Sequence, residues 1–160
     1  MNTAQTTQST PLERISRGDY FISSFIDTVP SGSFKKWSIL VGAKDIHFGF
    51  EVITSNRCFI TFYINSTTTA STSSKPFNNS NHDSTKTTDT EMVTGLSGGD
   101  GTVWLRSASY PGGVGLSGND MGARAEELIL AANSKHVLRV SNDEGTTMNY
   151  SLRAAFYDSQ

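Results

Sequence analysis

The sequence predicts an all-β protein, a jelly-roll-like antiparallel β-sandwich of about eight strands with long polar loops. Composition is the first reason, because only 36% of the 160 residues are hydrophobic and 18% are charged. A chain this rich in Ser, Thr, Asn and Gly is typical of short strands joined by polar turns, not of helical bundles. The second reason is the alternation of apolar and polar residues in two segments, 45–54 and 148–157. Nine Phe, five Tyr and two Trp provide the volume of one core.

An N-terminal arm is expected to precede the sandwich. We divide the chain into an extended arm, residues 1–19, and a single sandwich domain, residues 20–160. The start of the arm is polar and uncharged, and residues 12–19 are compatible with either one helical turn or an extended chain.

The first half of the domain contains four expected strands. Residues 20–26 are rich in β-formers and precede the turn signal at Pro30, and a second run covers 34–41. The clearest strand is 45–54, in which Ile46, Phe48, Phe50 and Val52 share one face. The short link at 55–56 then predicts a hairpin with a strand at 57–64.

Residues 65–90 differ from the rest, because 18 of the 26 positions are Ser, Thr or Asn and only Phe77 is large and apolar. Such a segment buries too little apolar surface to offset its ordering entropy. We therefore expect either a long exposed loop or a segment that a partner orders.

The second half continues with short strands. They are expected at 91–94, 102–107, 126–130, 135–141 and 148–157. Glycine turns are expected at 97–101, the proline- and glycine-rich stretch 108–122 is expected to be irregular, and 142–145 is expected to close a hairpin. The strand at 126–130 is a choice against local helix propensity in 123–132.

No catalytic, cofactor or metal site is predicted. His47, His82 and His136 are far apart in sequence, and the neighbours His82 and Asp83 do not form a triad by adjacency. Asp100 and Asp120 lie among glycines but lack calcium-loop spacing, so turns are favoured. Arg17-Gly18-Asp19 is an adhesion-type tripeptide whose glycine is better explained as a bend before the first strand. Trp37 and Trp104 lie in strands, where burial in the core or an interface is favoured over sugar stacking.

Charge and cysteine content narrow the function classes. The net charge of −2 and the scattered Lys and Arg argue against nucleic-acid binding. The single cysteine, Cys58, lies in an apolar run and is expected to be a buried thiol. No signal peptide or span of about 20 apolar residues is recognisable, which predicts synthesis in the cytoplasm and no membrane partner.

Several strand segments carry a resemblance to a known group. These are Ser31–Phe34, Ile39–Val41, Ile46–Val52, Glu127–Leu130, His136–Val140 and Phe156–Asp158. Together, over residues 31–158, they resemble small virion proteins of tailed bacteriophages, the capsid decoration (cement) and minor structural proteins. The chain departs from that pattern after Phe62-Tyr63, where Ile64 stands in place of an acidic residue, and at residues 1–30.

The resemblance implies a structural, non-enzymatic virion protein on the capsid exterior. It would bind the major capsid protein and itself, as a homotrimer or a dimer, and stabilise the shell through many symmetry-related contacts. The capsid contact is expected at the root of the arm, on Arg14, Arg17, Tyr20 and Phe21, with Tyr20 and Phe21 anchoring the arm. The alternative is a tail-fibre or receptor-binding tip whose loops, 65–90 and 108–122, contact host glycans.

Overall fold

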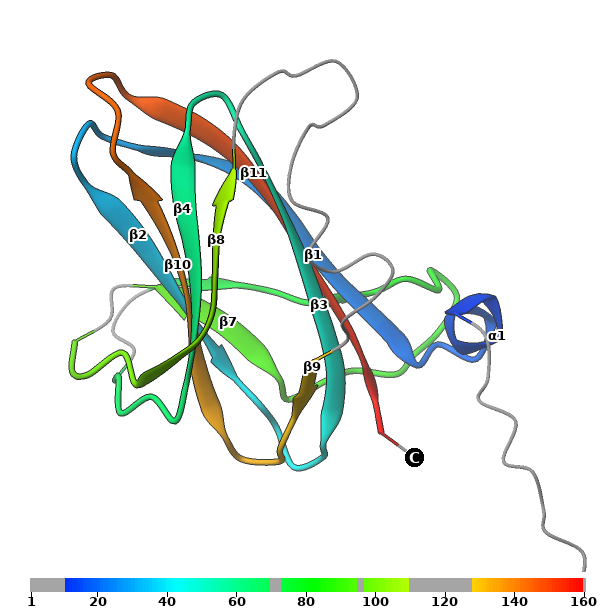
Figure 1. Cartoon of the computed structure of the whole chain (residues 1–160). Coiled ribbons are helices and arrows are strands. Elements are labelled where there is room, and N and C mark those ends of the chain that lie inside the picture. Colours follow the sequence, from blue (N-terminus) through cyan, green and yellow to red (C-terminus); the bar gives the residue numbers. More distant parts are fainter. Residues whose placement is uncertain (1–10, 70–72, 95–96, 110–127, 160) are drawn as a thin grey trace, which may run out of the picture.

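Over its described residues, the chain folds as a sandwich of two antiparallel sheets with one short helix, as composition and alternation predicted (Figure 1). The computed structural model describes residues 11–69, 73–94, 97–109 and 128–159. Sheet A contains, in spatial order, β6 (Asn78–Asn79), β1 (Tyr20–Val29), β11 (Met148–Asp158), β3 (Ile46–Thr54) and β9 (Leu128–Leu130). Sheet B contains β5 (Ser73–Lys75), β7 (Glu91–Thr94), β2 (Phe34–Leu40), β10 (Lys135–Asn142), β4 (Cys58–Ile64) and β8 (Thr102–Ser109).

Eight of these strands have the order of a jelly roll. The chain alternates between the sheets from β1 to β4, continues in sheet B with β8, and alternates again to β11. This path produces two four-stranded sets, β1-β11-β3-β9 and β2-β10-β4-β8, which is the jelly-roll arrangement. The short strands β5, β6 and β7 come from the β4–β8 connection and extend both sheets, β6 beside β1 and β7 beside β2.

The core lies between the sheets and is rich in phenylalanine. The four predicted inward residues of β3 are all buried, as are the even-numbered residues of β11 from 148 to 156. Phe50 of sheet A stacks on Phe62 of sheet B with ring centroids 5.7 Å apart. Both alternating segments therefore face the core as predicted, and Cys58 is buried among them.

Neither predicted hairpin forms. β3 pairs with β11 and β9, whereas β4 pairs with β10 and β8 in the other sheet. The 142–145 connection likewise carries the chain from β10 in sheet B to β11 in sheet A. Alternation shows which side of a strand is buried. It does not show to which sheet the strand belongs, because both sheets bury one face in the same core. A short link therefore fits a crossing between sheets as well as a hairpin.

The polar segment at 65–90 is not simply an exposed loop. Phe77 is buried and meets Phe156 edge-on, with ring centroids 4.9 Å apart. β6 adds to β1 in sheet A, and β5 adds to sheet B beside β7. Ser66, Thr68 and Thr90 are also buried. The described part of this segment packs on the chain's own body through one aromatic anchor, strand pairing and side-chain hydrogen bonds.

The expected arm and the glycine-rich loop are described only in part. Pro11–Ser16 form the helix α1, so this part of the arm is helical and not extended. β8 runs to Ser109, further than expected, and Leu128–Leu130 form the predicted strand. Residues 1–10 and 110–127, Asp120 included, lie outside the described residues. In the described part of the chain, no helix is both long and apolar enough to cross a membrane.

Candidate interaction surfaces

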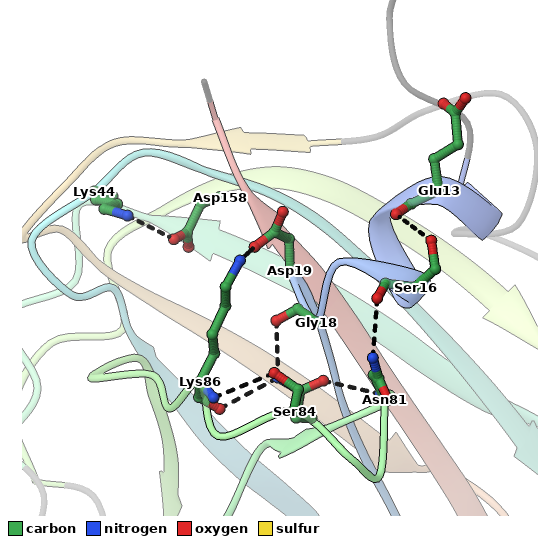
Figure 2. Close-up of polar contacts among 10 residues, drawn as sticks. Glu13, Ser16, Gly18, Asp19, Lys44, Asn81, Ser84, Lys86 and Asp158 are labelled. Atoms are coloured by element: carbon green, nitrogen blue, oxygen red, sulfur yellow. Dashed lines mark hydrogen bonds and ion pairs between the residues drawn. The ribbon is translucent and has the colours of Figure 1, made fainter.

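The root of the arm is held by a polar segment that begins with β6. Figure 2 shows α1 and the start of β1 beside residues 78–86, here called the strap. The Asn81 amide donates a hydrogen bond to the Ser16 carbonyl at 3.0 Å, and the Asn79 amide donates one to the Gly18 carbonyl at 2.8 Å. Lys86 forms an ion pair with Asp19. Polar contacts of asparagine and lysine side chains therefore fasten the strap to α1 and the start of β1, in place of apolar packing.

The four residues predicted to contact a capsid have different surroundings. Phe21 is buried and stacks on Phe156, and the guanidinium of Arg14 lies 3.6 Å from the centroid of the Tyr157 ring. Tyr20, half-buried, begins β1, and Arg17 is exposed. Phe21 and Arg14 therefore fasten the arm to the body, and a capsid contact stays a prediction that depends on Arg17 and Tyr20.

The Arg17-Gly18-Asp19 tripeptide has a structural explanation. Gly18 has a φ of 70° at the bend between α1 and β1. A Cβ at this position would overlap the Ser84 hydroxyl of the strap. Because Asp19 is held by Lys86, its carboxylate is engaged within the chain.

A second surface lies on the outer side of sheet B. Two neighbouring rows of side chains cross β2, β10, β4 and β8 and alternate with core residues such as Trp37, Leu138 and Phe62. One row is Phe34, Ser141, Phe59 and Ala108, and the next is Lys36, Arg139, Thr61 and Arg106. Arg57 directly precedes β4, two residues before Phe59 of the aromatic row. We call Phe34, Lys36, Arg57, Phe59, Arg106 and Arg139 the basic aromatic face.

Cations of this face stack on its two phenyl rings. The Arg139 guanidinium lies 3.8 Å from the centroid of Phe34, which is 44% exposed. Arg106 and Arg57 lie 5.1 and 5.5 Å from the centroid of Phe59. Such contacts attract a cation to the negative face of the ring and hold the side chain in place.

Two carboxylates border the basic aromatic face. Asp100 pairs with Lys36 at 2.7 Å, and Asp143 lies 3.9 Å from Arg57. Within the described residues, Arg106 and Arg139 make no ion pair, and Arg139 Nε donates to the Ser141 hydroxyl. The face therefore carries more positive than negative charge, although the whole chain carries −2.

The outer side of sheet A is different in chemistry. Ile26 of β1 and Ile53 of β3 both lie opposite Ser151 of the intervening β11, and they are 78% and 42% exposed. In the adjacent row, Arg153 lies opposite Glu51. This surface combines two exposed aliphatic side chains with a neighbouring pair of opposite charges.

A polar network enters the sandwich beside the β1–β2 connection. Trp37 Nε1 donates to the Tyr150 hydroxyl at 3.0 Å, and that hydroxyl lies 3.5 Å from Asp27. Burial by itself raises the pKa of Asp27, but hydrogen bonds from Lys35 and the Thr28 backbone bring the pKa below its ordinary value. Burial raises the pKa of Tyr150 far above its ordinary value. These groups satisfy one another in the interior, where an unpaired polar atom is expensive.

The histidines do not converge. His82 is exposed, with Nδ1 3.0 Å from the carboxylate of its neighbour Asp83, while His47 stacks on Tyr157. His136 is buried, with Nε2 2.7 Å from the Ser134 hydroxyl. No three His, Cys, Asp or Glu side chains among the described residues are grouped so that they could hold a metal ion. That the chain has no catalytic site stays a prediction.

The two tryptophans have opposite surroundings. Trp37 is buried as expected, but Trp104 is 44% exposed on β8, the edge strand of sheet B. It lies where the β4–β8 register shifts, between Val103, which is opposite Tyr63, and Leu105, which is opposite Phe62. The extra residue of this bulge turns the indole away from full burial, so Trp104 is not a core residue, and its burial in an interface stays a prediction.

Sequence reasoning missed the basic aromatic face. Its signal was present, because Phe34 and Lys36 alternate with Trp37 and Ile39, and Arg139 alternates with Leu138 and Val140. Only the pairing of β2, β10, β4 and β8 brings these residues together. No family model matches the chain, and no curated protein matches it.

Proposed function

We propose that this chain is a structural virion protein that decorates and stabilises the capsid shell of a tailed bacteriophage by binding the major capsid protein. The basic aromatic face carries the proposal. Arginine and aromatic residues are enriched at protein interfaces, and here they form rows across four strands of a rigid sheet. The jelly roll supports the proposal as well, because viral capsid domains frequently have this architecture.

The proposal includes self-association, as a trimer or a dimer. Its support is the outer side of sheet A, where Ile26 and Ile53 are exposed beside the charged pair Arg153 and Glu51. A second copy would cover the isoleucines and bring opposite charges together across the contact. An oligomer docked at many symmetry-related sites of a shell gains affinity through multivalency.

The decisive experiment mixes the purified protein with phage shells assembled without it. Decoration predicts regular labelling of the shells in negative-stain images and saturable cosedimentation at a fixed ratio to the capsid protein. The same protein is applied to host cells in parallel. Binding to cells with no binding to shells would contradict the proposal.

One observation favours a second function, a receptor-binding tip that contacts host glycans. Trp104 and Val103 are exposed next to each other on the edge strand β8. An exposed indole offers a flat apolar surface for a sugar ring, and lectin domains also occur as jelly rolls. Because the other tryptophan is buried, a change in fluorescence on adding host glycan, lost in Trp104→Phe, would support this function. If glycan causes no change in the fluorescence of the wild type and Trp104→Phe still binds shells, the receptor-binding function is contradicted.

A further inference from the structure

The basic aromatic face has a charge and a geometry that specify its partner more closely. Four cations lie on it, with Asp100 and Asp143 at its borders, on a chain whose net charge is −2. This local excess of positive charge is opposite in sign to the molecule as a whole. A partner surface of negative charge would be attracted to this face and repelled by the remainder of the chain.

Contacts within the chain fix the side chains of Arg139 and Arg106 before any partner binds. Arg139 is fixed from two sides, by the Phe34 ring at 3.8 Å and by the Ser141 hydroxyl at 3.1 Å. Arg106 lies over Phe59 from the neighbouring strand. A guanidinium fixed in this way loses less conformational entropy when it binds a carboxylate, with which it can form two parallel hydrogen bonds.

The rings supply the apolar part of an interface. Phe34 is 44% exposed although it lies in a row with the half-buried Phe59. The best-defined protein interfaces have aromatic and arginine anchors that become fully buried on binding. A pattern of guanidinium groups between phenyl rings fits a protein surface of carboxylates and apolar groups better than a uniformly charged polymer.

We infer that the basic aromatic face binds an acidic surface of a partner protein, with Arg106 and Arg139 pairing to its carboxylates and Phe34 covered by the contact. The inference deepens the proposed function, since the partner there is the major capsid protein. It specifies which face of the decoration protein meets the shell. It also specifies the charge of the shell surface that receives it.

The experiment removes two charges from the face and, as a match, two from elsewhere. The test variant is Arg106→Gln with Arg139→Gln. The control variant is Lys135→Gln, exposed at the start of β10 and outside the basic aromatic face, with Lys44→Gln in the exposed turn before β3. Both variants lose the same formal charge. Circular dichroism and thermal unfolding establish that each is folded before binding is compared.

Binding is measured by cosedimentation with undecorated shells and by titration with poly-L-glutamate. Raising the salt concentration from about 50 to about 300 mM is expected to weaken wild-type binding, because salt screens the attraction between exposed charges of opposite sign. At low salt the test variant should bind shells at least tenfold more weakly than wild type, and the control variant within about twofold. Equal losses in both variants, or no loss in the test variant, would overturn the inference.

The probes separate failure of the inference from failure of the proposed function. If the wild-type protein and the test variant decorate shells equally well, the proposed function is supported and the inference is overturned. If the protein does not bind shells but binds poly-L-glutamate through Arg106 and Arg139, the proposed function is overturned, and an acidic polypeptide is still supported as the partner. Tighter binding to dextran sulfate than to poly-L-glutamate at equal charge would identify a polyanionic saccharide and overturn the inference.

Discussion

At the scale of single residues, His136 makes the stability of the fold depend on pH. Burial lowers the pKa of His136 to about 4, and its ring stacks on Phe62 in the core. In the unfolded chain the pKa of a histidine is about 6.5. The unfolded state therefore binds a proton first, and stability falls as pH decreases from about 6.5 to about 4.

We expect the free energy of unfolding to fall by about 2 kcal/mol between pH 7 and pH 5 on account of His136. Urea unfolding of wild type and His136→Gln across this range measures the difference. The variant should lose that part of the pH dependence, whereas His82→Gln, a change at an exposed histidine, should retain it. Equal pH profiles for wild type and His136→Gln would contradict the prediction.

Tyr150 tests the buried polar network. Its hydroxyl accepts the hydrogen bond from Trp37 Nε1 inside the sandwich. Tyr150→Phe preserves the ring but leaves the indole N–H without its acceptor, which should reduce the free energy of unfolding by about 1–3 kcal/mol. Tyr63→Phe removes a hydroxyl from the half-buried outer side of β4 and should change stability by less than about 0.5 kcal/mol. Similar values for the two variants would show that the network contributes no specific stability.

At the scale of elements, the strap holds the root of the arm through a close approach at Gly18. Gly18 and Gly32 have similar backbone conformations, with φ of 70° and 62°. A Cβ would overlap Ser84 at Gly18 but meets nothing within 4 Å at Gly32. Either alanine substitution should cost about 1–2 kcal/mol for the left-handed conformation, and the overlap with Ser84 adds to this cost only at Gly18.

The expected results are a larger fall in the free energy of unfolding for Gly18→Ala than for Gly32→Ala, and faster proteolysis within residues 78–86 in Gly18→Ala alone. Adding Ser84→Gly should recover the part caused by the overlap. If both alanine variants unfold alike and resist protease alike, the strap does not depend on this contact.

Elements were predictable where one face of a strand is buried. Ile46, Phe48, Phe50 and Val52 alternate because a sheet buries every second residue, and this pattern is visible without coordinates. Residues 78–86 were not recognisable as ordered, because the Asn79 and Asn81 amides bind backbone carbonyls of a segment more than 60 residues away in sequence. The partial exposure of Trp104 was not predictable for a related reason, since a bulge depends on the register with β4.

At the scale of the whole molecule, pairing between distant strands determines the path of the chain between the two sheets, which local sequence patterns did not predict. The link at 55–57 leads from sheet A to sheet B, and this crossing is part of the jelly-roll path. The same pairing assembles the basic aromatic face from β2, β10, β4 and β8. Local patterns therefore predicted the class of fold, whereas the candidate interface required the topology.

The outer side of sheet A gives the last prediction, which concerns the number of copies in solution. Burying Ile26 and Ile53 against a second copy removes apolar surface from water, and the small Ser151 between them leaves room for a partner side chain. We expect wild-type protein to have a mass of two or three chains by sedimentation equilibrium. The double variant Ile26→Lys, Ile53→Lys should shift toward the single chain with its circular dichroism unchanged. Ile129→Lys provides a single-substitution control, because Ile129 is also exposed on this side but lies on the edge strand β9, away from the isoleucine pair. A monomeric wild type, or an equal effect of the control, would contradict self-association through this surface.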